Sequence, residues 1–323
     1  MKKVESIKKL IFICVLVFIV ALSSKCYAAD SQNINAIDYD IQMNKDGSAI
    51  VSEIWDMEIN PEIGIIEKEF EEGIKVTGVE VSEYDSNGNE KIKYTCVDGT
   101  LKENEFSNIK SSEGKNVIKI KPTIPADCKM YFLITYKLEN IYKKYNDCTE
   151  INIRLQNNKF NFNSHEISGR IKFENTVEEN DFKAWITSKE KSEVSMREES
   201  IIYFSTDKNE ANEILSLRVV LLNNAIEASE ENKIDENKLT SIIEEENAKI
   251  DAKKEQEKLD MIFDIIIVGM VIVIIVIIII IVTIISLKRI KAKKIEKRID
   301  QLDDLEDVKK ENQKEEIKEN KVE

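Results

Sequence analysis

The chain has 323 residues, of which 42% are hydrophobic and 33% are charged, and its formal net charge is −14 at pH 7. This length is sufficient for one large or two modest domains with a hydrophobic core. The acidic excess argues against nucleic acid and other polyanions as partners, because their binding depends on Lys and Arg side chains that neutralise phosphates.

The first 28 residues have the pattern of a secretory signal peptide. Four lysines among the first nine residues precede the apolar run 10–22, and the small residues Ala28 and Ala29 close the segment. This order of basic, apolar and small residues is typical of exported chains. We therefore expect residues 1–28 to direct export, with cleavage after Ala28. Retention as an anchor stays an alternative, although the apolar run is short for spanning a bilayer.

A β-hairpin is predicted in the stretch YDIQMNKDGSAIVSEIWDMEI, residues 39–59. Apolar and polar residues alternate on both sides of an Asp-Gly pair, and glycine readily adopts the positive φ of such a turn. We expect Ile50 and Ile54 to face the core, and Val51 and Glu53 to lie on the other face or at an edge.

The two tryptophans of the chain are interpreted as core residues. Trp55, in the predicted hairpin, is expected to contribute buried apolar area to the core. Trp185 lies in the run FKAWITS. An exposed tryptophan could serve as a carbohydrate platform, but a buried or half-buried tryptophan with a satisfied indole N–H is the more common arrangement.

Short alternating runs separated by turn signals continue from residue 34 to about residue 222, without a long helical pattern. About a dozen strands at such spacing predict a mainly β ectodomain, an antiparallel β-sandwich over residues 29–223. Pro122 and Pro125 flank a loop that is a candidate boundary between two sub-sandwiches. In the run YFLITYKL, the more apolar face is expected to point to the core, and it consists of Phe132, Ile134, Tyr136 and Leu138.

Three cysteines remain once the signal segment is set aside: Cys96, Cys128 and Cys148. One disulfide can form between two of them, which leaves one thiol over, and the sequence does not decide the pairing. Isolated cysteines without His or Cys neighbours argue against a zinc site.

No arrangement of residues in this part of the chain predicts catalysis. His165 is the only histidine, and its neighbour Ser164 would point to the opposite face of a strand. Asp85, Asn87 and Asn89 partly match a calcium loop, but the glycine is misplaced, so a turn is the better interpretation. We therefore assign no catalytic, cofactor or metal residues and expect no enzyme activity.

Residues 224–264 are rich in Glu, Lys and Ala and lack Pro and Gly. Their apolar residues recur at helical spacing in a thin stripe, which predicts a charged helical stalk. A homodimer through a coiled coil in this stalk is an alternative to a single helix.

A transmembrane helix is predicted over residues 265–287, IIIVGMVIVIIVIIIIIVTIISL, which carry no charge. At about 1.5 Å per residue the segment reaches about 34 Å, enough for a hydrocarbon core of about 30 Å. Inside a bilayer a helix satisfies all backbone amides within the segment, so the β-propensity of isoleucine does not argue against it.

A basic cluster follows the predicted span: Lys288, Arg289, Lys291, Lys293, Lys294, Lys297 and Arg298. By the positive-inside rule, the tail 288–323 is expected to be cytoplasmic and the β-rich domain to lie outside the cell membrane. The expected exterior, residues 29–264, has 49 acidic and 30 basic residues and a net charge of −19. The cluster is expected to contact the anionic headgroups of the inner leaflet.

Two segments resemble a known family of predicted membrane proteins, domain of unknown function 2207. They are the hairpin IDYDIQMNKDGSAIVSEIWDMEI, with its Val51-Ser52-Glu53 strand, and the segment Tyr136–Phe173. Together they cover approximately residues 34–222. The resemblance implies an exported β-rich domain on a membrane protein, and it implies no catalytic residues. Larger members carry further membrane helices, whereas this sequence has one predicted helix and a short charged tail.

Three functions remain open from the sequence. A single-pass surface protein whose ectodomain binds or scaffolds an unidentified extracellular or cell-envelope protein is the favoured one. A transmembrane sensor that couples the ectodomain to the tail is the first alternative, and an extracytoplasmic enzyme is the less favoured second.

Overall fold

The computed structural model describes residues 32–58, 64–85, 87–123, 129–222, 225–227 and 232–319. The predicted signal segment 1–28 and Cys128 lie outside the described residues. The first strands in chain order are β1 (Gln32–Met43), β2 (Ala49–Glu58), β3 (Ile66–Glu69), β4 (Lys75–Tyr84), β5 (Glu90–Lys93), β6 (Thr95–Cys96), β7 (Glu105–Lys110) and β8 (Asn116–Lys121). They are followed by β9 (Lys129–Glu139), β10 (Tyr142–Lys144), β11 (Thr149–Gln156), β12 (Phe162–Phe173), a 3₁₀ turn (Glu179–Asp181), β13 (Phe182–Thr187), β14 (Ser192–Glu198), β15 (Ile201–Asn209), β16 (Leu215–Leu221) and the helix α2 (Leu239–Glu319).

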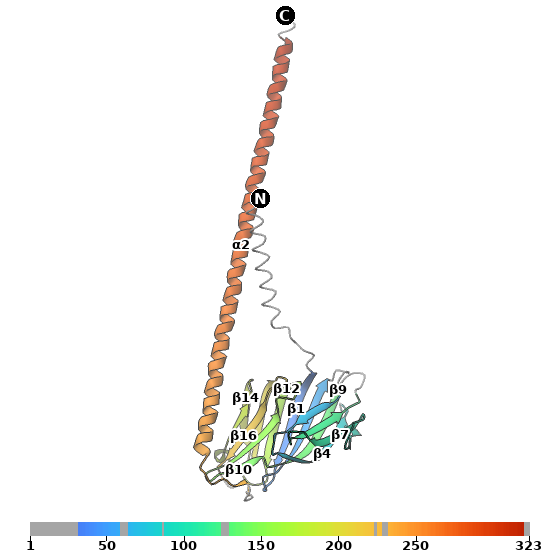
Figure 1. Ribbon diagram of the computed structural model, residues 1–323. Coiled ribbons are helices and arrows are strands. Elements are labelled where there is room, and N and C mark those ends of the chain that lie inside the picture. The colour runs from blue at the N-terminus through green and yellow to red at the C-terminus, as the bar shows by residue number, and fades with distance from the viewer. Residues whose placement is uncertain are drawn as a thin grey trace. The chain divides into compact units, whose positions relative to one another are not determined.

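The described strands form three sheets. The large sheet has the order β14-β15-β12-β1-β2-β9-β4-β5 (Figure 1). The β11 sheet has the order β10-β11-β16-β13, and the β8 sheet has the order β3-β8-β7-β6. Inward side chains of all three sheets meet in one hydrophobic cluster, for example Ile41 of the large sheet, Ile153 of the β11 sheet and Ile118 of the β8 sheet. The mainly β fold predicted from the alternating runs is thereby confirmed.

The sheets are mixed rather than purely antiparallel as expected. The predicted β1–β2 hairpin is present, with Tyr39 opposite Glu53, but the other side of β1 pairs in parallel with β12. A parallel neighbour requires a long crossover connection, and the chain between β2 and β12 supplies it. Pairing over so great a sequence separation leaves no local signal in either strand.

The predicted facing of β2 is wrong. Ile50 and Ile54 point outward and are 45% and 52% exposed, whereas Val51, Glu53 and Trp55 are buried. Strand residues alternate between the two faces, so a single register decides all of these positions together. The observed register buries Trp55 as predicted. It also requires a carboxylate in the core, which is tolerated only when that carboxylate is paired.

Glu53 is the centre of a buried polar network. Its Oε1 atom lies 2.9 Å from the Nζ atom of Lys68 on β3 and accepts a hydrogen bond from the hydroxyl of Tyr136 on β9. Its Oε2 atom accepts a hydrogen bond of 2.8 Å from the indole Nε1 of Trp55. Lys68 also donates to the main-chain oxygen of Leu155 on β11, at 2.9 Å. One carboxylate and one ammonium group therefore connect all three sheets.

Burial keeps the hydroxyls around this network protonated. The pKa of Tyr136 is raised well above its usual value, first by desolvation and then by the negative charge of Glu53. The pKa of Tyr39 is raised in the same way. Both groups therefore stay neutral hydrogen-bond donors over the physiological pH range.

The turn of the β1–β2 hairpin is stabilised by a hydrogen bond within the turn and by contacts with residues outside the hairpin. Gly47 has φ +78°, and a Cβ atom at this position would lie 2.0 Å from the ring of Tyr142 on β10. The Oδ1 atom of Asp46 accepts a hydrogen bond from the amide of Ser48 at 2.9 Å. On the same turn, the carbonyl of Lys45 accepts a hydrogen bond of 2.7 Å from the amide of Glu227.

The helix begins later than the expected stalk from residue 224, because α2 starts at Leu239. Ala225 and Ile226 are instead buried in the main hydrophobic cluster. The chain divides into two compact units, residues 1–247 and residues 248–323, so the first turns of α2 belong to the β-rich unit.

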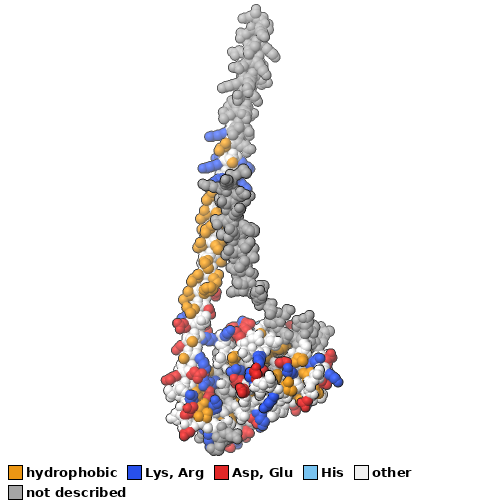
Figure 2. All heavy atoms as spheres, viewed as in Figure 1, with side chains coloured by type: hydrophobic (Ala, Val, Ile, Leu, Met, Phe, Trp, Pro, Cys, Tyr) orange, Lys and Arg blue, Asp and Glu red, His pale blue; other side chains and the backbone are white. Residues whose placement is uncertain are grey.

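The second unit, considered by itself, carries the apolar stretch. Within the described residues, one helical segment, Leu239–Ile295, contains a stretch long and apolar enough to cross a membrane. Figure 2 shows apolar side chains along this stretch and Lys and Arg side chains beyond it. The hydroxyls of Thr283 and Ser286 donate to the carbonyls of Ile279 and Val282, so polar groups within the stretch are satisfied by the helix itself.

Replacing Gly47 by Ala tests the packing of the hairpin turn. We expect Gly47→Ala to lower the free energy of unfolding by about 3 kcal/mol, because it combines strain at positive φ with overlap against the Tyr142 ring. Gly88→Ala is the matched control, since Gly88 has φ +80° and open space around it, and it should cost only about 1 kcal/mol. Equal losses in chemical denaturation of the two variants would contradict the role of Tyr142.

The buried pair can be tested by a double-mutant cycle. Glu53→Gln and Lys68→Met should each destabilise the β-rich domain by about 3 kcal/mol or more, because each leaves a buried charge without its partner. The double variant leaves no buried charge and should be more stable than the sum of the two losses predicts. Additive losses in denaturant unfolding would mean that the two side chains do not act as a pair.

Candidate functional site

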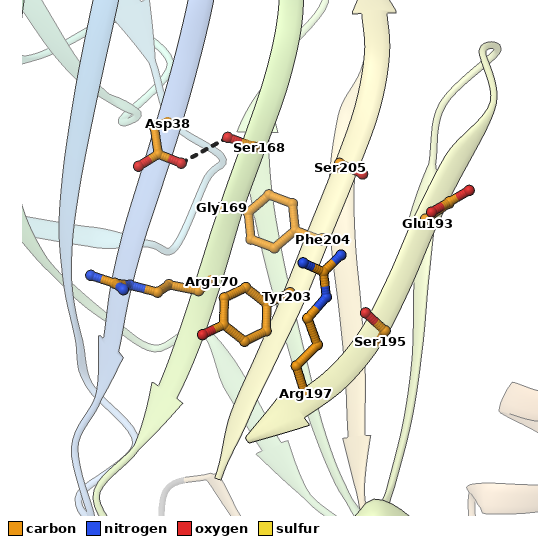
Figure 3. Close-up of a pocket in the computed structure, with 10 residues that line it drawn as sticks. All are labelled: Asp38, Ser168, Gly169, Arg170, Glu193, Ser195, Arg197, Tyr203, Phe204 and Ser205. Carbon is orange, nitrogen blue, oxygen red and sulfur yellow. Dashed lines mark hydrogen bonds between the residues drawn. The ribbon is translucent and has the colours of Figure 1, made fainter. Parts of the chain in front are cut away.

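A hollow lies on the outer face of the large sheet, over the four neighbouring strands β1, β12, β15 and β14. Two rows of outward residues pair across these strands: Asp38, Ser168, Ser205 and Glu193 in one row, and Asp40, Arg170, Tyr203 and Ser195 in the next. The hollow has a volume of about 300 Å³ and is lined by the residues of these rows other than Asp40, together with Gly169, Arg197 and Phe204 (Figure 3). Because the sheet register places these side chains, the site is built on strands rather than on loops.

Arg170 forms one wall of the hollow and is held in place by an ion pair. Its Nε and Nη2 atoms donate to the two oxygens of Asp40 at 3.2 and 2.9 Å, so the side chain extends toward β1 (Figure 3). Lys172 also donates to Asp40, at 3.3 Å. The hydrogen bond from Arg170 is the largest cause that holds the pKa of Asp40 below its usual value.

Arg197 forms the opposite wall and has a different setting. It lies at a register shift between Met196 and Glu198 on β14, where a bulge can redirect a side chain. Its guanidinium group lies over the ring of Tyr203, 5.4 Å from the ring centroid. The Tyr203 hydroxyl donates to Glu198 at 2.8 Å. Within the described part of the chain, Arg197 makes this contact with the Tyr203 ring and no ion pair. Its charge is therefore available to a ligand.

A second hollow of about 710 Å³ adjoins the first and shares Ser168 and Ser205 with it. Its far end is lined by His165, Glu166 and Asp207. We call the two hollows together the outer-face groove. The groove is open, and its lining mixes polar side chains with the apolar residues Phe204, Ala36, Ile37 and Ile167.

His165 lies on the surface, as predicted. It is exposed on β12, whereas Ser164 is buried and accepts a hydrogen bond of 2.8 Å from Gln156. The two neighbours thus face opposite sides of the sheet and form no nucleophile–base pair. The segment that begins at Asp85 also forms the predicted turn. The Oδ1 atom of Asp85 accepts hydrogen bonds from the amides of Asn87 and Asn89, each at 2.9 Å.

A second polar site joins the β-rich unit to the start of α2. Arg218 on β16 contacts Glu150 on β11 at 2.7 Å and Glu246 on α2 at 2.6 Å. It also lies 3.2 Å from Glu245. The two oxygens of Asp147 accept hydrogen bonds from the amides of Lys238 and Leu239, at 2.8 and 3.2 Å. A carboxylate at this end of a helix satisfies free N–H groups and favours the helix dipole.

The same junction has an apolar part. Ile242 of α2 is fully buried in a small cluster with Tyr145, Cys148 and Val220, and Trp185 is half-buried against it. Burial raises the pKa of Tyr145 to about 12, so its hydroxyl remains a donor to Glu150, at 3.2 Å. We call these contacts of Arg218, Asp147 and Ile242 the helix junction.

The basic cluster predicted after the span lies on α2. The side chains of Lys288, Arg289, Lys291, Lys293, Lys294 and Arg298 are exposed, and that of Lys297 lies outside the described residues. Cys96 is exposed and Cys148 is buried, and the two are not joined by a disulfide. Burial raises the pKa of Cys148 to about 12, which keeps this thiol protonated. Because Cys128 lies outside the described residues, a disulfide that involves it stays a prediction.

Neither the groove nor the junction was predicted from the sequence. The run SEVSMRE, which forms β14 and carries Arg197, was not recognised as a strand, although Val194 and Met196 alternate with polar residues in it. Arg218 lies in a recognised strand, but nothing local indicates its partners 68 and 28 residues away.

The comparisons with known proteins identify one family. A family model described as "Predicted membrane protein (DUF2207) N-terminal domain" matches residues 33–221. No curated protein matches the chain.

Among solved structures, a protease candidate from Parabacteroides distasonis is 12% identical with a TM-score of 0.37, over 60% of this chain and 41% of that one. An M1 zinc metallopeptidase from Deinococcus radiodurans is 7% identical with a TM-score of 0.30, over 58% of this chain and 42% of that one. The chain thus spans about two fifths of the length of these structures, and likenesses of this size carry no inference about activity.

Replacing Arg218 tests the helix junction. Arg218→Ala removes the guanidinium group that pairs with the mostly buried carboxylates of Glu150 and Glu246, so the free energy of opening residues 239–247 should fall by about 3 kcal/mol. Hydrogen exchange of the full chain measures this opening. Arg154→Ala, which removes a half-exposed pair with Glu71, should leave the exchange of this segment unchanged. Equal protection of residues 239–247 in the wild type and Arg218→Ala would contradict the junction.

Proposed function

Because this chain belongs to the DUF2207 family of predicted membrane proteins, we propose that it is a single-pass protein of the cell membrane whose β-rich domain binds or scaffolds a component of the cell envelope. The apolar stretch of α2 is the proposed anchor. The outer-face groove is the observation that carries the binding role. It places several hydroxyl groups on an exposed sheet face, together with Arg197, which has no ion-pair partner among the described residues.

The proposed orientation places the β-rich domain outside the cell. The basic cluster that follows the apolar stretch favours a cytoplasmic tail by the positive-inside rule. Each of these charges gains about 1 kcal/mol near anionic headgroups, so the inner leaflet is a proposed partner. The signal pattern at residues 1–28 supports the same orientation.

A sensor is the second candidate function, and the helix junction favours it. The first turns of α2 are held to the β11 sheet through Arg218 and Asp147, and the same helix carries the apolar stretch. A ligand that changed this contact would alter the start of the membrane helix. Dimerisation through the segment of α2 that follows the helix junction would be one way to transmit this change, although the apolar stripe of that segment is thin.

An enzymatic role is not part of the proposal. Ser164 and His165 point to opposite faces of β12, which does not suit nucleophilic catalysis. The groove contains side chains suited to hydrogen bonding and charge recognition.

The binding role can be tested with the full chain on intact cells. Heterologous cells that produce the chain should retain fluorescently labelled envelope fragments, and external protease should abolish the retention because the β-rich domain is outside. A chain that lacks residues 300–323 should retain the fragments equally well if binding is the function. Retention that does not depend on the chain, or a β-rich domain that survives external protease, would overturn the proposal. Loss of retention with the tail would favour the sensor.

A further inference from the structure

We propose that the outer-face groove binds a sugar chain that bears carboxylate groups, with one carboxylate held by Arg197. This inference rests on the proposed binding function and names the ligand class of its site. It follows from the setting of Arg197, the polar side chains that line the groove and the groove's length.

The setting of Arg197 suits a carboxylate. Its guanidinium group lies over the ring of Tyr203 and forms no ion pair within the described residues, so its N–H groups are open to a ligand. A guanidinium edge matches the two oxygens of a carboxylate in a bidentate contact. Arg170 differs, since its charge is already shared with Asp40. The groove therefore offers one cation that a ligand can pair without displacing a protein partner.

The remaining lining suits hydroxyl groups. Ser195 and Ser205 present hydroxyls that can both donate and accept, while Asp38 and Glu193 can accept hydrogen bonds from a ligand. Ser168 donates to Asp38 at 2.8 Å and retains its acceptor capacity. A sugar ring with several hydroxyls can donate hydrogen bonds to the carboxylates and exchange hydrogen bonds with the serines. A simple anion has no hydroxyls to donate, and the carboxylates of Asp38 and Glu193 would repel it.

The shape of the groove suits a chain rather than a single sugar. The two hollows share Ser168 and Ser205 and continue to His165, Glu166 and Asp207. The floor between them consists of small serine side chains, so consecutive sugar units can pass over it. The open face leaves both ends of the bound chain free to continue.

An acidic peptide fits the same surface less well. The carboxylates of Asp38, Glu193, Glu166 and Asp207 would repel a run of acidic side chains that has no hydroxyls to offer them. The strongly acidic exterior also repels polyanions at long range, so affinity must come from the short-range contact at Arg197. A short acidic oligosaccharide is therefore the appropriate probe.

The test measures binding of tri-galacturonate to the full chain in nanodiscs by calorimetry, with neutral galactotriose and tri-glutamate as comparison ligands. Tri-galacturonate should bind, and the other two should bind at least about tenfold more weakly. Arg197→Gln should weaken tri-galacturonate binding about tenfold or more, and Arg197→Lys should also weaken it, because lysine lacks the planar fork. Lys110→Gln removes an exposed charge on β7 and should change the affinity less than twofold.

Three outcomes would overturn the inference: no binding of tri-galacturonate, equal affinity in the wild type and Arg197→Gln, or preference for tri-glutamate, which would indicate a peptide site. Equal melting curves for the wild type and Arg197→Gln verify that the variant is folded. If cells still retain envelope fragments while tri-galacturonate does not bind, the ligand class is wrong and the binding function stands. If neither occurs, the proposed function itself fails.

Discussion

The buried ion pair between Glu53 and Lys68 lies where the three sheets meet. Two charges removed from water are tolerated only if they are paired and their remaining hydrogen bonds are satisfied. Here Trp55 and Tyr136 donate to the carboxylate, and the ammonium group reaches the main chain of β11. These requirements constrain the register of β2 and the placement of β3 at once. The pair thus selects one arrangement of sheets among those that would bury a similar apolar area.

The register set by this pair also determines what the outer face presents. Because side chains alternate along each strand, burying Val51, Glu53 and Trp55 places Ile50 and Ile54 outside. Farther along the same sheet, β12, β15 and β14 turn serine, arginine and tyrosine side chains outward, and these form the groove. The core and the candidate binding surface are therefore two faces of the same sheet.

The start of α2 is part of the β-rich fold. Ile242 fills a cluster beneath β16, while Asp147 and Arg218 satisfy the helix start and its acidic side chains. A helix end without such contacts would leave amide groups unsatisfied. The proposed binding surface and the first turns of α2 consequently belong to one compact unit, which ends at Asn247.

Local composition and local period were enough for several features: the mainly β class, the β1–β2 hairpin, the inward face of β9 and the apolar stretch of α2. Each of these depends on residues close together in the chain. The facing of β2, the parallel β1–β12 pair, the bulge at Arg197 and the Arg218 contacts were decided by tertiary structure. An alternating strand with Ile on one face and Val, Glu and Trp on the other has two plausible orientations. Burial of the glutamate becomes tolerable only because Lys68, on a strand of another sheet, pairs with it.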